Sequence, residues 1–349
     1  MIDEAPATPT EEAKAQNFEA GAAAPSAAPG ASARAHQPLR VVRPPAECLR
    51  ATDKPRITRL NSCFYSTGTM VFSEITSSGS VTVLGTFVVN ELVYVYTDPR
   101  NSQVFNQTSL KVTNRTGIAT SDLTLSGNFV CTTYCDGKRG SLPSRTVGTQ
   151  TIYAVGKLEP VLARGAKSNI FSNWSFTYAK AGHSSETFSS KALAPRCDNN
   201  AVRSMGRGCV FPEGRVSLVY SKSDPTVGEV ARHIGLAQES GLPSKLTRTT
   251  VAQKDANRLA ACPRSITRPE GLECDEYPFA SSVQGGAAGG SARVFDGCGL
   301  TIIPGTGPTG FSRCLVSKGT NRTAGAMLNR MYFDKRVLVE DHYTVLITP

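Results

Sequence analysis

The sequence has no run of about 18 apolar residues, so no segment is long enough to cross a membrane as a helix. It holds only 4 histidines in 349 residues, and no two cysteines are separated by two residues, so the common zinc-binding patterns are missing. Residues 1–40 lack a basic segment followed by an apolar one, and a secretory signal peptide is not recognisable there. These absences exclude a helical membrane protein and a zinc finger.

Length and charge favour a two-domain protein with an anionic partner. A chain of 349 residues is too long for one ordinary domain, and its hydrophobic content of 40% is enough to build packed cores. The net charge of +10 favours binding to a polyanion. Residues 195–349 contain 19 basic and 14 acidic residues, and the rest of the chain contains as many of each, so charge does not single out one half.

The ten cysteines indicate disulfide bonds. An even number, spread over both halves, is typical of proteins from an oxidising compartment, whereas reduced, buried thiols are the alternative. We give this pattern more weight than the unrecognised signal peptide and expect a secreted protein. Spacing does not determine the pairing, but short loops are the simplest expectation: Cys197–Cys209, Cys262–Cys274 and Cys298–Cys314.

The N-terminal half reads as a linker followed by an all-β domain. Residues 1–40 are rich in alanine and proline without apolar periodicity, which predicts a disordered linker. Residues 41–194 contain β-branched and aromatic runs, including 81–89 and 92–96 with Asn90-Glu91 as a tight turn between them. We expect this region to be a sandwich-like domain. Its role is unknown, because it shows no cluster of acid, base and nucleophile.

Residues 195–349 alternate between strand and helix patterns, which predicts an α+β domain. Asp224 and Pro225 are expected to cap and begin a helix with one apolar face, and Thr250 with Gln253 forms a capping box for a second helix that ends near Ala261. A third helix is expected at about 324–331. Strands are expected at 216–220, 290–295, 299–303 and 343–347.

Two motifs in this domain carry chemistry. Asp275-Glu276-Tyr277-Pro278 precedes a glycine-rich loop at 285–290, and Asn321-Arg322-Thr323-Ala324-Gly325 follows about forty residues later. Neighbouring side chains on a strand point to opposite faces, so one carboxylate is expected to enter a cleft while the other packs or acts from behind. Together the motifs resemble the NucA/NucB deoxyribonucleases, whose core reads roughly D-E-[YW]-P, then G-G, then N-R-x-A-G. The resemblance runs from near Val216 to the C-terminus.

The resemblance implies a ββα-metal-like nuclease fold and a set of roles. Asp275 matches the catalytic base and Glu276 the next family position. Asn321 matches a metal ligand that binds through its carbonyl oxygen, with Asn329 or Glu276 as further ligands to Mg²⁺ or Mn²⁺. Arg322 is expected to bind a phosphate. Two departures from the family pattern weaken the assignment of Asn329 as a second ligand: Thr323 replaces a usual glycine, and the spacing to Asn329 is one residue short.

Ordinary structural roles remain alternatives for several of these residues. Asn321 can be a helix cap, Asn329 a surface amide and Arg322 an exposed arginine. His233 is expected to be a packed structural residue rather than a catalytic one, because it lies beside the apolar face of its helix. A basic run can follow a DNA backbone or form a solvated face, and its members are Lys245, Arg248, Lys254, Arg258, Arg264 and Arg268. Of these, we expect Lys254, Arg258 and Arg268 to bind substrate.

The leading hypothesis is a secreted, metal-dependent, sequence-nonspecific endodeoxyribonuclease that contacts the DNA backbone. One alternative is a nuclease toxin with a small acidic inhibitor protein as its partner. The other is a non-enzymatic β-sandwich binding protein whose nuclease domain is degenerate, for which the altered segment after Asn321 is the sequence evidence.

Overall fold

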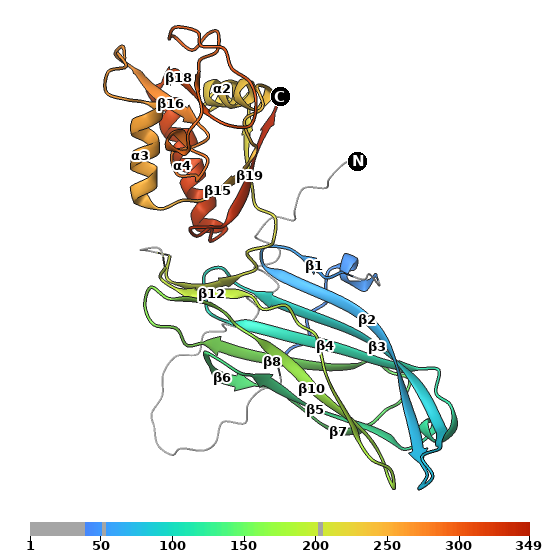
Figure 1. The fold of residues 1–349 in the computed structure, drawn as a ribbon. Helices are drawn as coiled ribbons and strands as arrows, with labels where there is room; N and C mark the ends of the chain where they lie inside the picture. The colour runs from blue at the N-terminus through green and yellow to red at the C-terminus, as the bar shows by residue number, and fades with distance from the viewer. Residues whose placement is uncertain (1–38, 51–53, 202–204) are drawn as a thin grey trace, which may run out of the picture.

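In the computed structural model, residues 39–50, 54–201 and 205–349 are described. The predicted linker over residues 1–40 therefore lies almost wholly outside the described residues. The described chain forms a long β-rich part and a smaller part that contains α-helices, stacked end to end (Figure 1).

Two antiparallel sheets build most of the β-rich part. Their strand orders are β1-β2-β3-β4-β8-β6 and β11-β10-β5-β7. The inner faces share one core, in which the rings of Phe87 and Tyr178 pack edge to face with their centroids 4.9 Å apart. A third sheet has the order β13-β12-β9. The strands are β1 (Arg56–Ile57), β2 (Asn61–Ile75), β3 (Val81–Thr97), β4 (Val104–Thr113), β5 (Leu123–Cys131), β6 (Cys135–Arg139), β7 (Ser141–Thr146), β8 (Ile152–Pro160), β9 (Lys167–Asn169), β10 (Ser172–Lys180), β11 (Glu186–Ser189), β12 (Arg196–Asn199) and β13 (Arg207–Val210).

Strand β3 is continuous from Val81 to Thr97. Asn90 and Glu91 pair with Thr67 and Ser66 of β2, so the tight turn predicted at this position is wrong. Pairing with strands on both sides outweighs the low strand propensity of these two residues. The Glu91 side chain is buried and accepts a hydrogen bond of 3.3 Å from the Ser66 hydroxyl. Burial raises the pKa of Glu91 to about 7.

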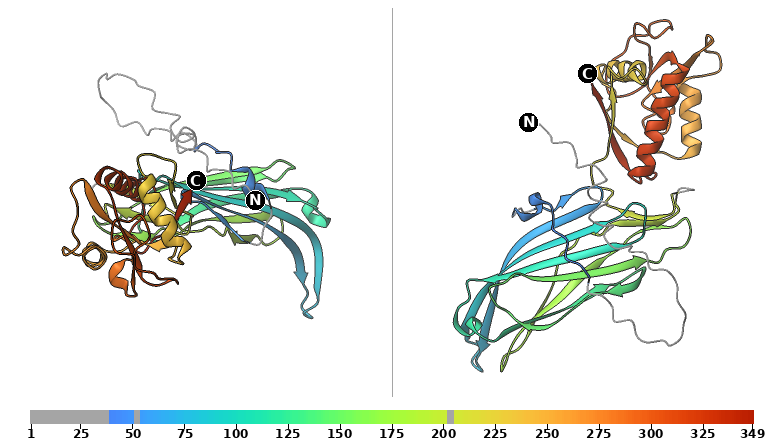
Figure 2. Two further views of the ribbon diagram at one scale, coloured as in Figure 1. Left: turned by 90° about the horizontal axis from the view of Figure 1, so that it is seen from above. Right: turned by 180° about the vertical axis from the view of Figure 1, so that it is seen from behind.

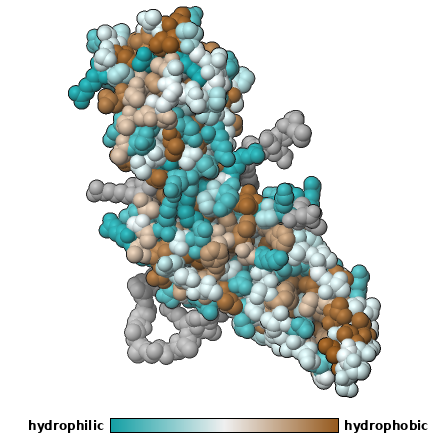
Figure 3. Space-filling model, viewed as in Figure 1, coloured by the Kyte–Doolittle hydropathy of each residue, from teal (hydrophilic) through white to brown (hydrophobic). Residues whose placement is uncertain are grey.

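The hairpin of β2 and β3 extends beyond the rest of the β-rich part. Figure 2 shows from two further sides that it curves away from the neighbouring strands. Val71, Ile75 and Val81 are exposed on it, and Figure 3 shows apolar residues gathered at this end of the molecule. Over the described residues, none of the helices combines the length and apolar character needed to cross a membrane.

The C-terminal part surrounds a second core with two small sheets and three α-helices, as far as the described residues show. The sheet orders are β14-β19-β15, in which β14 and β19 run parallel, and β16-β18-β17. The elements are β14 (Ser217–Ser221), α2 (Gly228–Glu239), β15 (Lys245–Thr247), α3 (Val251–Ala261), β16 (Leu272–Tyr277), β17 (Ala292–Arg293), β18 (Phe311–Ser317), α4 (Lys318–Asp334) and β19 (His342–Thr348). Short 3-10 helices are η1 (Ala46–Leu49), η2 (Gly117–Thr120) and η3 (Gly286–Ala288).

The predicted helices are present, but two of them begin elsewhere. Helix α3 follows Thr250, whose hydroxyl oxygen accepts from the Gln253 amide as predicted. Helix α2 begins at Gly228 rather than at Pro225, because Asp224 binds the amide and hydroxyl of Thr226 in a local turn instead of capping the helix. Its predicted apolar face is buried.

The third predicted helix and two predicted strands also differ in extent. Helix α4 begins at Lys318, earlier than predicted, because Ser317 caps it. Of the predicted strands at 290–295 and 299–303, only β17 and a bridge between Val294 and Ile303 form.

All ten cysteines form disulfides, and the three predicted pairs are confirmed: Cys197–Cys209, Cys262–Cys274 and Cys298–Cys314. Cys48–Cys63 and Cys131–Cys135 complete the set. Cys197, Cys209 and Phe211 pack into the first core, and Val216 packs into the second. The chain therefore passes from one core to the other between residues 211 and 216.

A buried network of arginines and aspartates joins the two parts. Arg336, in the loop between α4 and β19, donates to both carboxylate oxygens of Asp198 at 2.5 and 2.7 Å. Asp341, in the same loop, accepts from Arg59 at 2.7 Å and also from Arg196. Burial alone would raise the pKa of Asp341, but the two arginines hold that pKa below its usual value. The loop that follows α4 is thus fixed by residues of the β-rich part.

Candidate active site

Strand β16 carries three carboxylates at the edge of its sheet. Since β16 is an outer strand, with only β18 beside it, side chains from both of its faces can reach the same opening. Asp275 and Glu273 share one face, towards α2 and α4. Glu276 lies on the other face, towards α3. The expectation that the two adjacent carboxylates point to opposite faces is met, yet both line one pocket.

That pocket lies between α3 and α4 and encloses about 580 Å³. Its lining brings together most of the residues predicted from the sequence. Those that line it are Lys254, Arg258, Arg268, Asp275, Glu276, Asn321 and Asn329. Glu273, which the sequence prediction missed, lines it as well.

His233 holds Asp275 from behind. Its Nδ1 atom lies 2.7 Å from Asp275 Oδ2, and its Nε2 atom lies 2.9 Å from the Ser312 hydroxyl. An ionised carboxylate only accepts hydrogen bonds, so Nδ1 is the donor in this pair. The imidazole is buried and is not part of the pocket lining. Its contact with Asp275 was not predicted, because 42 residues separate the two in the chain.

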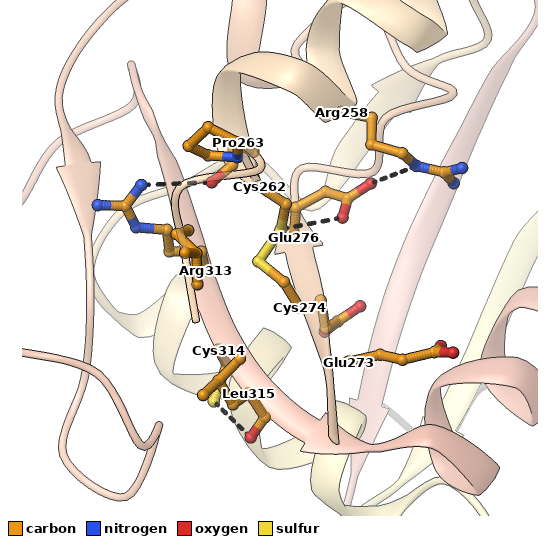
Figure 4. The surroundings of a disulfide bond; sticks show 12 residues. Arg258, Cys262, Pro263, Glu273, Cys274, Glu276, Arg313, Cys314 and Leu315 are labelled. Atoms are coloured by element: carbon orange, nitrogen blue, oxygen red, sulfur yellow. Dashed lines mark hydrogen bonds and ion pairs between the residues drawn. A yellow bond between two sulfur atoms is a disulfide. The ribbon is translucent and has the colours of Figure 1, made fainter. Parts of the chain in front are cut away.

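Glu276 lies between a disulfide and an arginine (Figure 4). One of its oxygens is 3.6 Å from the Cys262 sulfur, which is bonded to Cys274, and the other is 3.8 Å from Arg258 Nε. Burial raises the pKa of Glu276 to about 7, and the charge on Asp275 adds to the effect. Arg258 and Lys254 act in the opposite direction. The Glu276 carboxyl is therefore only partly ionised at neutral pH, because burial outweighs the attraction of the two cations.

Glu273 and Asn321 form the other side of the pocket. The Asn321 amide nitrogen donates to Glu273 Oε2 at 3.1 Å, which leaves the Asn321 carbonyl oxygen as the atom for another partner. Arg322 Nε lies 3.6 Å from Glu273 Oε1, but the Arg322 side chain is exposed and does not line the pocket. The position of Glu273, two residues before Asp275 on a strand, was the signal that could have revealed it.

The start of α4 presents Asn321 to the pocket. Ser317 caps the helix by accepting from the Thr320 amide at 3.4 Å, so the alternative role of Asn321 as a helix cap is wrong. Glu229 of α2 accepts from the Ser317 amide at 2.6 Å and fixes this end of the helix. Thr323 bonds back to the Gly319 carbonyl without breaking α4. The departure from the family pattern at this position therefore leaves the helix regular.

A comparison with protein families agrees with this arrangement. Residues 237–346 match the family model of deoxyribonuclease NucA/NucB. The matched segment holds the three carboxylates, Asn321 and Asn329, whereas His233 precedes it. The name of the family model describes deoxyribonucleases, and residues 237–346 are called the NucA/NucB region below. No curated protein matches the chain.

Members of the basic run predicted from the sequence have different surroundings in the structure. Lys254 and Arg258 project from α3 into the pocket lining, and Arg268 lines it from the loop that follows. Arg248 belongs elsewhere: its guanidinium lies over the Tyr332 ring at 4.4 Å and donates to the Val337 carbonyl. The basic run of the sequence is therefore partly structural.

The glycine-rich loop of the NucA/NucB region packs against α3 and lies outside the pocket lining. A Cβ atom on Gly285 would lie 2.4 Å from the Asn257 side chain, so only glycine allows this approach. The Asn257 amide donates to the Ala280 and Ser282 carbonyls and anchors the loop. Gly285 and Gly286 therefore serve the packing of this loop against α3.

Proposed function

We propose that this protein is a secreted, metal-dependent endodeoxyribonuclease that cleaves DNA without sequence preference. The observation that carries the proposal is the convergence of Glu273, Asp275, Glu276 and Asn321 on one pocket bordered by cations. Hydrolysis of a phosphodiester needs a base for water, neutralisation of the phosphate charge and groups that hold the strand. The pocket offers a candidate for each.

Asp275 is the candidate base. His233 engages its Oδ2 atom, so Oδ1 is the oxygen that can accept a proton from water. The water oxygen then attacks phosphorus, and the bond between phosphorus and the leaving sugar oxygen breaks. His233 and Ser312 act as positioning residues, because they fix the carboxylate without lining the pocket.

The donor set fits a hydrated Mg²⁺ or Mn²⁺ ion. Among the described residues, no three His, Cys, Asp or Glu side chains are grouped as a metal cage. One carboxylate and one amide oxygen, completed by waters and phosphate, are what a hard divalent cation commonly uses. Glu273 and Asn321 would hold it, and Glu276 and Asn329 of the same pocket lining are further candidate ligands. When bound, such an ion neutralises charge on the phosphate and on the leaving oxygen.

Lys254, Arg258 and Arg268 are proposed to hold the DNA backbone. All three line the pocket, and none of these contacts would distinguish one base from another, which accords with cleavage of any sequence. The five disulfides support export to an oxidising compartment. The family match supports DNA as the polymer. The regular α4 helix across Thr323 favours an active enzyme over a degenerate one.

The test is a plasmid-nicking assay with the oxidised protein in Mg²⁺ or Mn²⁺, with EDTA as control. Asp275→Asn should abolish nicking. Asp255→Asn should not, because Asp255 is exposed on α3 and lies outside the pocket lining. Well-folded protein that fails to nick DNA in any of several divalent metals would refute the proposal.

A further inference from the structure

The disulfide between Cys262 and Cys274 forms part of the wall of the pocket. Both cysteines line it, and the Cys262 sulfur lies 3.6 Å from a Glu276 oxygen. Cys274 directly precedes Asp275 on β16, and Cys262 directly follows the last residue of α3. Figure 4 shows the disulfide beside the Glu276 carboxylate, with Arg258 beyond it.

This bond joins two elements with different tasks. Strand β16 carries the three carboxylates, whereas α3 carries Lys254 and Arg258. Residues 264–265 and 267–271 of the connection between them are exposed. Arg268 in this connection donates to the Cys262 carbonyl at 2.9 Å, so its position depends on Cys262 as well. The disulfide thus links the strand that carries the proposed catalytic carboxylates directly to the helix that carries the proposed DNA-binding cations.

Other contacts would keep the fold together if this disulfide opened. Asn257 of α3 is buried and donates to the Ala280 and Ser282 carbonyls. Cys298–Cys314 independently joins β18 to the loop before it. Opening Cys262–Cys274 should therefore release the last turn of α3 and the Arg268 connection while the core stays folded.

We propose that the Cys262–Cys274 disulfide is a positioning element of the active site and that its reduction lowers DNA cleavage. This inference rests on the proposed nuclease function. A small dithiol that enters the pocket attacks one sulfur and forms a mixed disulfide, and its second thiol then displaces the protein sulfur. The reductant leaves as a cyclic disulfide, and two electrons and two protons have passed to Cys262 and Cys274. The chain would then cut poorly in a reducing compartment and well after oxidation.

The experiment compares two double variants with the oxidised wild type. Cys262→Ser with Cys274→Ser removes the disulfide in the pocket wall, and Cys131→Ser with Cys135→Ser removes one in the β-rich part. For the first variant, kcat/KM on DNA should fall at least about tenfold, with a rise in KM as part of the change, because the cations of α3 move. The second variant should cleave like wild type. Near-ultraviolet circular dichroism checks folding.

A first variant that is folded and cleaves like wild type overturns the inference. If that variant does not fold, wild type is titrated with dithiothreitol; at each point one aliquot is assayed directly, and a second is alkylated and mapped by mass spectrometry. Activity of the first aliquot should fall as Cys262 and Cys274 become alkylated in the second, and it should return when unalkylated protein is reoxidised. Activity that survives reduction of these two cysteines also overturns the inference. Oxidised wild type that cuts no DNA would instead refute the proposed function.

Discussion

The Nδ1 atom of His233 on α2 lies 2.7 Å from the Oδ2 atom of Asp275 on β16. Both side chains are buried, so each limits the positions that the other can take. The helix packed behind the strand thereby sets the direction in which the carboxylate faces the pocket.

His233→Ala should lower kcat for DNA cleavage by about ten- to a hundredfold, as the loss of a positioning partner commonly does. KM should change little, because His233 does not contact the pocket. Steady-state kinetics on a labelled duplex would measure both constants. His342→Ala is the matched control, since His342 is exposed on β19. A rise in KM with an unchanged kcat would contradict the positioning role.

Lys254→Ala should weaken DNA binding and reduce its dependence on salt. One phosphate contact contributes about one unit to the slope of log K against log salt concentration. Binding of an uncleaved duplex in EDTA, followed by fluorescence anisotropy at several salt concentrations, gives that slope. Arg264→Ala should leave it unchanged, because Arg264 is exposed and outside the pocket lining. Equal effects of the two substitutions would place the DNA elsewhere.

Asp341→Asn should destabilise the protein by about 3 to 5 kcal/mol, because it leaves Arg59 and Arg196 buried without a counter-charge. Glu340→Gln changes the neighbouring residue in the same way, but the pair of Glu340 with Lys167 is exposed. That control should cost less than about 1 kcal/mol. Urea unfolding of both variants tests the difference, and equal midpoints would show that the buried network adds no stability.

Wild type should become less stable as pH rises, and Glu91→Gln should abolish this dependence on pH. The folded-state pKa of Glu91 is about 7, against 4.5 for the free side chain, so the folded state binds this proton more tightly. The stabilisation is complete below pH 4.5 and is lost as pH rises through 7, by up to about 3 kcal/mol.

Urea unfolding at pH 5 and pH 8, followed by fluorescence of Trp174 in the first core, would measure this difference. Trp174 is the only tryptophan in the chain, so the signal reports on the β-rich part. Glu74→Gln, on the exposed end of β2, serves as the control. A wild-type stability that does not fall between the two pH values would contradict the buried, protonated state of Glu91.

Local patterns in the sequence predicted what local interactions decide. Thr250 caps α3 through a contact three residues away, and Cys262 pairs with a cysteine twelve residues away. The apolar spacing in α2 identified its buried face because period alone determines which residues share a side. The opposite orientations of Asp275 and Glu276 followed from the same reasoning.

The features that the sequence did not predict are determined by contacts between residues far apart in the chain. Asn90 and Glu91 look like a turn in isolation, but two neighbouring strands hold them extended. The partnership of His233 with Asp275 depends on packing α2 against β16. The structural use of Arg248 depends on the Tyr332 ring, which comes from a helix late in the chain. The local sequence around these residues does not indicate which distant residues they contact.

The joint between the two parts and the interiors of those parts are secured by different chemistry. Each disulfide closes a separation of no more than 16 residues inside one part, whereas the joint relies on Asp198 and Asp341 with their arginines. A thiol reductant therefore acts on bonds inside each part and has no disulfide to cut between them. The ion pairs of the joint depend instead on buried charges, and Asp341 keeps its charge into acid because its pKa lies below the usual value. The contacts within the parts and those between them thus respond to different changes in the solution.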